Sequence, residues 1–240
     1  KSMERWISAM YSDDPSDTDV ITAGQSVSRI IAKEDGVLSG RPILDYLIEN
    51  YCNGATTEWN FTEGQGFQKG QEIASIVAKS DEILKIERIC MNLITRLSGI
   101  ASTTSKWSEQ LGGVFLAATR KTNWGVLDKW AVHIGGGLTH RLDRSDGLMI
   151  KENDFSMSKL TLEEILSTFR TATDFPVIEV VSSDQALSVA NSWIELQSGL
   201  STTYQLTLMM DNLGPENCRE FSDRLVDMGL RQKFVLEGSG

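Results

Sequence analysis

Five short apolar runs alternate with helical patterns through the second half of the chain, and this alternation limits the possible folds most. The run starts lie roughly thirty residues apart. The runs are Val114–Ala118, Gly147–Ile150, Pro176–Val181, Gln205–Met210 and Lys233–Leu236. The helical patterns are Leu127–Ile134, Leu162–Phe169, Asp184–Leu196 and Pro215–Met228. Strands that alternate with helices predict an α/β fold with parallel strands, either a barrel or a doubly wound sheet.

Charged side chains stand in or directly after these predicted strands. Arg120 and Lys121 follow the first strand, Lys151 ends the second, and Glu179 lies within the third. Asp211 ends the fourth strand and Glu237 ends the fifth. The carboxyl ends of parallel strands meet at the mouth of a barrel or in the crevice of an open sheet. We therefore expect one rim that collects three cations followed by three carboxylates.

Positive charge is concentrated in the segment from Lys85 to Lys151, which holds ten Lys and Arg against five Asp and Glu, whereas the whole chain has a net charge of −10. A small anionic substrate would be repelled by the average surface and attracted to this segment. The acidic balance and the lack of a basic tail argue against general nucleic-acid binding.

The residue types at the rim suit anions and a hard metal ion. Arg120 and Arg141 can grip carboxylates or phosphates with two hydrogen bonds, and Lys121 and Lys151 act as point charges. His140 is a donor or a neutral acceptor. Ahead of it, residues 135–137 are all glycine, and a backbone without Cβ atoms permits close approach of a ligand.

Glu179 and Asp211 are candidate ligands for Mg²⁺, which binds one or two carboxylates together with substrate phosphates. A structural ion pair is the alternative role for these two side chains. Cations beside carboxylates suit the joining of an anionic acceptor to a Mg²⁺-bound sugar diphosphate.

The first half predicts a mixed domain. We expect a helix over Glu4–Tyr11, then short strands broken by turns from Val37 to Ala78. Ser80 can cap a helix that breaks at Gly99, with a second helix to about Gln110. In the second half, Thr161 with Glu164 has the spacing of a capping box, and Asp184 is a candidate N-cap.

Three scattered cysteines, Cys52, Cys90 and Cys218, are too few for a disulfide framework and fit a reducing cytosol. Cys90 falls in an apolar helical pattern and is expected to be a small core residue. No apolar run approaches the ~18 residues of a membrane span, and the first residues contain no signal-peptide core. A cytoplasmic protein is the expectation.

Ordered motifs along nearly the whole chain resemble the quinolinate phosphoribosyltransferase family, also called nicotinate-nucleotide pyrophosphorylase (carboxylating). The matching segments are 32–40, 87–93, 97–101, 119–122, 135–141, 150–153, 210–212 and 236–240. The resemblance implies an N-terminal α/β sandwich domain over residues 1–111, with a helical connection, and an incomplete α/β barrel over residues 112–240. It implies transfer of phosphoribose from phosphoribosyl pyrophosphate to quinolinate, with release of pyrophosphate and CO₂, and dependence on Mg²⁺.

The resemblance also implies roles for single residues. Arg120, His140, Arg141 and Lys151 would hold quinolinate's carboxylates, while Lys121, Glu179 and Asp211 would face the sugar diphosphate and its metal. Glu237, Ser239 and Gly240 would take part in binding the substrate, with Ser239 and Gly240 beginning the 5′-phosphate loop. Arg88 would reach into a neighbouring subunit's site, so that a homodimer is the minimal unit. We also expect the natural chain to continue beyond Gly240 by at least one strand and helix.

Three positions depart from the family pattern. Residues 124–128 replace a common Pro-Gly-Leu-Arg, which removes one cation, Asp154 replaces a histidine, and Val181 replaces an acidic residue. Two other functions stay open: a phosphoribosyltransferase for nicotinate or another pyridine acid, and a catalytically silent dimeric binding protein of the same fold.

Overall fold

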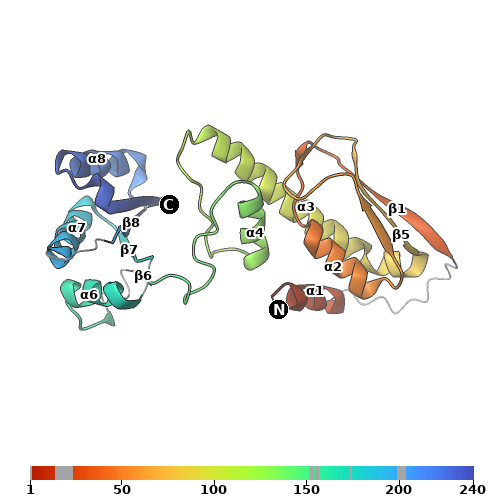
Figure 1. Ribbon diagram of the computed structural model, residues 1–240, viewed down its shortest axis with the longest axis horizontal. Helices are drawn as coiled ribbons and strands as arrows, with labels where there is room; N and C mark the ends of the chain where they lie inside the picture. Colours follow the sequence, from red (N-terminus) through yellow and green to blue (C-terminus); the bar gives the residue numbers. More distant parts are fainter. Residues whose placement is uncertain (1, 14–23, 152–153, 155–156, 173–174, 199–203) are drawn as a thin grey trace. The chain divides into compact units, whose positions relative to one another are not determined.

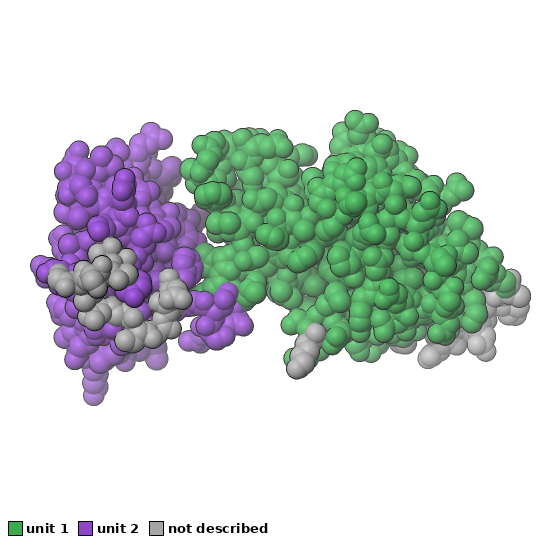
Figure 2. Space-filling view, in the orientation of Figure 1, with its two compact units in different colours: residues 1–142 green, residues 143–240 purple. Residues whose placement is uncertain are grey.

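The computed structural model describes residues 2–13, 24–151, 154, 157–172, 175–198 and 204–240. The chain divides into two compact units, residues 1–142 and 143–240 (Figure 2). The expected domain boundary between Leu111 and Gly112 stays a prediction. Among the described helices, none combines the length and apolar character that crossing a membrane requires.

The first unit combines a small antiparallel sheet with helices (Figure 1). Its sheet has the order β1 (Gln25–Ile31), β5 (Glu72–Lys79), β3 (Thr56–Trp59), and β2 (Gly36–Val37) pairs separately with β4 (Gly66–Phe67). The helices are α1 (Ser2–Asp13), α2 (Arg41–Tyr51), α3 (Ser80–Gln110) and α4 (Val126–Ile134). Apolar side chains of the sheet and of these helices form one core.

Helix α2 was missed in the sequence, where strands were expected from Val37 to Ala78. Its apolar stripe, which includes Ile43, Leu44 and Leu47, is a usable helical signal. Pro42 in the first turn is a further helix-start signal, but Gly40 at the N-cap has no side chain to accept a hydrogen bond. The carboxylate of Glu63 caps the helix instead, accepting the N–H groups of Gly40 and Arg41 at 2.9 Å each.

Helix α3 runs without a break from Ser80 to Gln110, so the predicted break at Gly99 is wrong. A glycine in a helix interior costs about 1 kcal/mol, and tertiary packing outweighs that cost here. The buried stripe continues past Gly99 through Ala101 and Thr104. Cys90 lies in this stripe, as predicted, and burial raises the pKa of its thiol to about 12, which leaves it inert as a nucleophile.

The predicted strand Val114–Ala118 is wrong in the described structure, where only an isolated parallel bridge joins Ala117 to Leu138. Val114 and Phe115 are 66% and 74% exposed, and the other three residues of the run are only partly buried, so the run is not part of a core. The segment is nevertheless tied to residue 138, because Ala118 N–H donates to Leu138 O and Leu138 N–H donates to Leu116 O, both at 2.8 Å.

The second unit is a four-stranded parallel sheet with helices, which confirms the expected α/β class. The strands, in sheet order, are β6 (Met149–Ile150), β7 (Val177–Val180), β8 (Leu206–Asp211) and β9 (Phe234–Ser239). The helices are α6 (Leu162–Ala172), α7 (Ser183–Gln197) and α8 (Gly214–Asp227), with a short 3₁₀ helix η1 (Arg231–Lys233). A parallel sheet of this kind is consistent with part of an α/β barrel.

The capping signals of this unit are confirmed in one case and corrected in the other. Thr161 N–H donates to Glu164 at 2.7 Å and Glu164 N–H donates to Thr161 Oγ1 at 3.2 Å, which is the predicted capping box of α6. The N-cap of α7 is Ser182 rather than Asp184, because Ser182 Oγ accepts the N–H of Gln185. Asp184 lies in the first turn, where a negative charge favours the helix.

Helices cover one face of this sheet. Ile178, Leu208 and Leu236 are in register across β7, β8 and β9 and pack against the apolar sides of α6, α7 and α8 (Figure 1). Successive side chains of a strand point to opposite faces. The other face therefore receives the residues between them, and these include the predicted carboxylates.

Candidate active site

The three predicted carboxylates lie on the same face of the sheet, opposite the face that the helices cover. Glu179, Met209 and Glu237 are neighbours in register across β7, β8 and β9. Asp211 lies two residues after Met209 and thus on the same face, opposite Ser239 of β9. Glu179, Asp211 and Glu237 are half-buried. The parallel register brings these acidic side chains to one end of one face.

Lys151 joins this group directly, because its ammonium forms an ion pair with the Glu179 carboxylate. Lys151 follows β6, one residue beyond the last paired position of β6 and β7. The carboxylate of Asp154 accepts the backbone N–H of Lys151 at 2.9 Å and closes the turn after β6. The departure at Asp154 therefore has a structural use.

The ends of β8 and β9 meet through Asn212. Its N–H donates to Ser239 O at 2.7 Å, and its side-chain amide donates to Asp211 Oδ2 at 2.9 Å. Asn212 adopts a left-handed φ of 56°. A Cβ at Gly240 would lie 3.0 Å from Asn212 Oδ1, so the close approach of the strand ends favours glycine there. Asp211, Ser239 and Gly240 are thus brought together, as predicted.

A metal ion at this face would need oxygens from a substrate. Among the described residues, no group of three or more Asp, Glu, His or Cys side chains is arranged to hold a metal. Glu179 and Asp211 supply two hard carboxylates on one face. That donor set fits Mg²⁺, which commonly binds few protein ligands and completes its shell with water and phosphate.

In the first unit, Arg120 and Lys121 occupy an exposed loop between the bridge at Ala117 and α4. The Lys121 N–H donates to Thr119 Oγ1 at 3.0 Å, which turns the backbone at the two cations. The rest of the loop is anchored by Asp128 of α4. Its carboxylate accepts Thr122 Oγ1 at 2.6 Å and the N–H of Trp124 at 3.2 Å.

Asp128 also forms a paired contact with Arg96 of α3, whose Nε and Nη2 donate at 2.8 Å each. Burial by itself raises the pKa of the Asp128 carboxyl, but hydrogen bonds from Arg96, Thr122 and Trp124 outweigh it. The net effect lowers the pKa below its ordinary value, so the carboxylate is charged at neutral pH. The Arg96 guanidinium lies over the Trp124 ring, 4.8 Å from its centroid.

His140 and Arg141 follow Leu138 on the other side of the bridge. His140 has a left-handed φ of 50°, and its Nδ1 accepts the N–H of Arg141 at 2.7 Å. An accepting Nδ1 carries no proton, so a neutral His140 ring carries its N–H at Nε2. The backbone here is held by the Lys129 ammonium, which donates to Thr139 O and Arg141 O at 2.5 and 2.9 Å.

The expected ligand-facing role of the three glycines is wrong for two of them. A Cβ at Gly135 would lie 2.4 Å from Ala101 O of α3, and one at Gly137 would lie 2.7 Å from Val132 Cγ1. These two glycines permit close packing inside the protein. Gly136 has a left-handed φ of 90° and open space beside it, which suits a turn.

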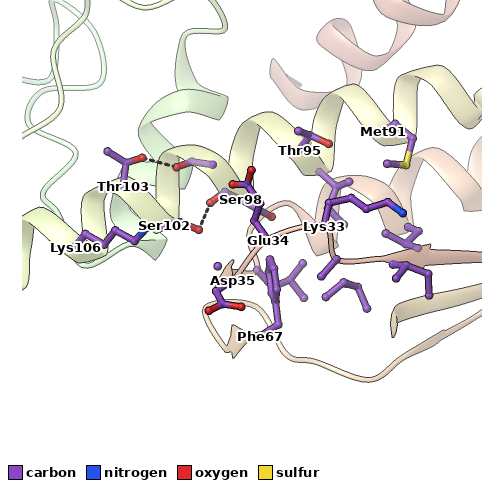
Figure 3. Close-up of a pocket in the computed structure, with 18 residues that line it drawn as sticks. Lys33, Glu34, Asp35, Phe67, Met91, Thr95, Ser98, Ser102, Thr103 and Lys106 are labelled. Carbon is purple, nitrogen blue, oxygen red and sulfur yellow. Dashed lines mark hydrogen bonds between the residues drawn. The ribbon is translucent and has the colours of Figure 1, made fainter. Parts of the chain in front are cut away.

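Arg88 is exposed on α3, one turn before Met91. Met91 and Thr95 line a cavity of about 420 Å³ between α3 and the segment Ile30–Gly36. Figure 3 shows Lys33, Glu34 and Asp35 on one side of this cavity and the hydroxyls of α3 on the other. The cavity combines charged, hydroxyl and apolar groups, and it lies within the first unit.

The predicted residues therefore divide between the units. The first unit carries Arg88, Arg120, Lys121, His140 and Arg141, and the second carries Lys151, Glu179, Asp211, Glu237, Ser239 and Gly240. Sequence reasoning missed Arg96, Asp128 and Lys129. Two adjacent charges within the apolar pattern of a short helix, Leu127 to Ala131, were the signal that could have revealed the last two.

Family models match nearly the whole chain. The model of the quinolinate phosphoribosyl transferase N-terminal domain matches residues 17–98, and that of the C-terminal domain matches residues 100–240. A probable nicotinate-nucleotide pyrophosphorylase (carboxylating) of Archaeoglobus fulgidus is 33% identical over 88% of this chain and 79% of its own length. Its counterpart in Methanothermobacter thermautotrophicus is 29% identical, over 89% and 75%.

The fold agrees with solved structures. The crystal structure of NadC from Streptococcus pyogenes superposes with a TM-score of 0.82 at 25% identity, covering 99% of this chain and 83% of that one. The nicotinate-nucleotide pyrophosphorylase of Francisella tularensis has the same fold, with a TM-score of 0.82 at 23% identity, over 100% and 83%.

Proposed function

Since the chain belongs to the quinolinate phosphoribosyltransferase family, we propose that it transfers phosphoribose from phosphoribosyl pyrophosphate to quinolinate and releases CO₂. The product is nicotinate mononucleotide, an intermediate of NAD biosynthesis. The observation that carries the proposal is the match to both domains of the family, over residues 17–98 and 100–240.

Four side chains are proposed to hold quinolinate's two carboxylates: Arg120, His140, Arg141 and Lys151. Arginine and lysine form charge-assisted hydrogen bonds with carboxylates, and guanidinium groups do so with two parallel bonds. The geometry of His140 supports this role, because its accepting Nδ1 leaves an Nε2–H as the donor. A substrate carboxylate at Lys151 would compete with Glu179 for the ammonium.

The sugar diphosphate is proposed to lie against Lys121, Glu179 and Asp211, with its 5′-phosphate near Glu237, Ser239 and Gly240. Mg²⁺, held by Glu179 and Asp211 together with diphosphate oxygens, would neutralise charge on the departing pyrophosphate. The shared face of β7, β8 and β9 supports the grouping of Glu179, Asp211 and Glu237.

The chemistry then follows from charge. The quinolinate ring nitrogen forms a bond to the anomeric carbon of the sugar while the bond from that carbon to the diphosphate oxygen breaks. Positive charge that develops on the sugar is stabilised by a nearby carboxylate, Glu179 or Asp211. The ring nitrogen becomes cationic. The adjacent carboxylate leaves as CO₂, and the electron pair left on the ring carbon, stabilised by that cation, takes up a proton.

The proposal includes a homodimer or higher homo-oligomer in which Arg88 completes the site of a neighbouring subunit. Its support is that Arg88 is exposed on α3. Met91 and Thr95, farther along the same helix, line the cavity of Figure 3. A cytoplasmic setting belongs to the same proposal and is supported by Cys52, Cys90 and Cys218 being free thiols.

The direct test is release of labelled CO₂ from carboxyl-labelled quinolinate by the purified protein. Release is expected only with phosphoribosyl pyrophosphate and Mg²⁺ both present, and it is expected to stop when a chelator removes the metal. Formation of the mononucleotide from nicotinate, with no CO₂ from quinolinate, would instead establish the related phosphoribosyltransferase activity.

A silent binding protein of the same fold is distinguished by ligand-induced thermal shift. A carboxylating enzyme is expected to respond to quinolinate and to phthalate, which both carry adjacent carboxylates, more than to nicotinate. A catalytically silent protein without an acid-binding site would respond to none of the three.

A further inference from the structure

Helix α4 buries two adjacent opposite charges, Asp128 and Lys129. Asp128 is 6% exposed and Lys129 is 2% exposed. Charged side chains are rarely buried to this degree, because loss of hydration is costly unless hydrogen bonds replace it. The partners of these two residues therefore indicate what the charges hold in place.

Asp128 holds the loop that carries Arg120 and Lys121. Its carboxylate accepts Thr122 Oγ1 and Trp124 N–H, which come directly after the two cations, at 2.6 and 3.2 Å. Arg96 ties the same carboxylate to α3 with two bonds of 2.8 Å. The loop is thereby fixed to the longest helix of the unit by charge-assisted bonds.

Lys129 holds the segment that carries His140 and Arg141. Its ammonium donates to the backbone carbonyls of Thr139 and Arg141, at 2.5 and 2.9 Å, and to Ala118 O at 3.4 Å. Those carbonyls belong to both sides of the bridge between Ala117 and Leu138. One ammonium thus connects the backbone leading into Arg120 with the backbone around Arg141.

We propose that Asp128 and Lys129 act as a pair of positioning residues, which fix the two basic segments of the site from behind without contacting substrate. The inference rests on the proposed function for the identity of the substrate. Trp124, where the chain departs from the family pattern, belongs to this arrangement, because its N–H donates to the Asp128 carboxylate. We call the bonds of Asp128 and Lys129 to the two basic segments the clamp. Lys129 positions the segment assigned to quinolinate, whereas Asp128 positions Arg120 for quinolinate and Lys121 for the sugar diphosphate.

Steady-state kinetics of the full chain separate these two effects. Lys129→Met keeps the aliphatic stem and removes the ammonium, so the KM for quinolinate is expected to rise about tenfold, because small misplacements of binding groups are costly. The KM for phosphoribosyl pyrophosphate is expected to stay within about twofold. Thr122→Val removes one bond to Asp128 and is expected to raise both KM values, whereas Thr122→Ser keeps the hydroxyl and restores them.

Trp130→Phe provides the matched control on the same helix. It removes the 2.9 Å bond from Trp130 Nε1 to Glu63, which does not involve either basic segment. Both KM values are expected to be unchanged. Equal rises of the two KM values in Lys129→Met, or wild-type values in both Lys129→Met and Thr122→Val, would overturn the proposal. Should Lys129→Met fail to fold, the Thr122 pair decides the outcome alone.

Amide hydrogen exchange tests the positioning without relying on the activity. Lys129→Met is expected to speed exchange over residues 138–142, and Thr122→Val over residues 119–124, with α3 unchanged in both. Unaltered exchange in both segments would contradict the clamp even in an active enzyme. A further outcome is that the wild-type protein releases no CO₂ while the two variants still show these exchange changes relative to it. That result would contradict the proposed function and leave the positioning role standing.

Discussion

At the scale of single residues, buried and half-buried charges hold the molecule's polar segments in place by direct pairing. Glu63 caps α2 from more than twenty residues away, and Asp128 anchors the neighbouring cationic loop while pairing with the distant Arg96. Lys151 and the half-buried Glu179 form an ion pair at the sheet face opposite the helices. In that pair, a cation proposed for quinolinate is neutralised by a carboxylate proposed for the sugar diphosphate and its metal.

Glu179→Gln should separate the two roles in this pair. Without the competing negative charge, Lys151 is expected to bind quinolinate about two- to fivefold more tightly in the absence of the second substrate. Turnover is expected to fall by about tenfold or more, because a charge-stabilising carboxylate is lost. Calorimetry measures the first effect and CO₂ release the second. Asp223→Asn, which removes an exposed carboxylate on α8, is the control. Weaker quinolinate binding by Glu179→Gln would contradict the competition between Glu179 and quinolinate for Lys151.

Asp128 should also make the stability of the protein depend on pH. Its folded-state pKa is lowered, so its contribution is fully present above the unfolded pKa of about 4 and is lost as pH falls through the folded value. Asp128→Asn is expected to cost about 2 kcal/mol of unfolding free energy at pH 7. Urea unfolding at several pH values should show the difference between the two proteins shrinking below about pH 4. A difference that stays constant to pH 2 would show that charge is not its source.

At the scale of elements, α3 contacts two parts of the first unit. These are residues 37–39, ahead of α2, and the glycines at 135 and 137, ahead of His140 and Arg141. Ser98 Oγ accepts the N–H of Ser39 at 3.1 Å, and Ser102 Oγ accepts the N–H of Val37 at 2.8 Å. Farther along, Ala101 and Thr104 meet the backbone at Gly135 and Gly137. The family motif around Ser98 thus serves packing on at least two sides of one helix.

Two glycine substitutions, one within α3 and one at the end of α4, are expected to change stability in opposite directions. Gly99→Ala places a methyl in open space within a helix and should stabilise by about 0.5–1 kcal/mol. Gly135→Ala would place its Cβ 2.4 Å from Ala101 O, and forcing α4 away from α3 should destabilise by about 2 kcal/mol or more. Urea unfolding followed by circular dichroism compares the two. A stable Gly135→Ala protein would mean that the α3–α4 contact tolerates separation.

At the scale of the whole molecule, the predicted site residues are divided between two compact units. Anion-binding candidates are found in both, and the carboxylates are all in the second. If Arg88 acts in a neighbouring subunit, each functional site contains residues of two chains. One site then takes Lys151 from its own chain and Arg88 from the neighbouring chain.

Mixing two inactive proteins tests this composite site. Arg88→Ala and Lys151→Ala subunits are each expected to be inactive as homo-oligomers, because each lacks a cation proposed for the substrate. After subunit exchange, a mixed dimer contains one site with both cations, and up to about a quarter of wild-type activity should return. Exchange is verified by native mass spectrometry of size-tagged chains. Absence of activity in verified mixed dimers would show that Arg88 acts within its own chain.

Much of the second unit could be predicted from the sequence. The runs ending near Ile150, Val181, Met210 and Leu236 are strands, because a buried parallel strand needs an apolar run whatever surrounds it. Lys151, Glu179 and Asp211 followed from those strands. The first unit was predicted less well, since α2 takes its cap from Glu63 and Val114–Ala118 pairs only at Ala117.

The sequence by itself determined the α/β class, the family and the location of the acidic residues in the parallel strands, because apolar periodicity and ordered motifs are local properties of the chain. Only the tertiary structure decided that α3 continues through Gly99, that Gly135 packs on its backbone, and that Asp128 and Lys129 hold the two basic segments. The packing of Gly135 on Ala101 joins residues far apart in the sequence. The bonds of Asp128 and Lys129 span shorter separations but depend on the path that folding gives to the intervening loops. Whether a buried charge is stable depends on the partners that folding brings to it.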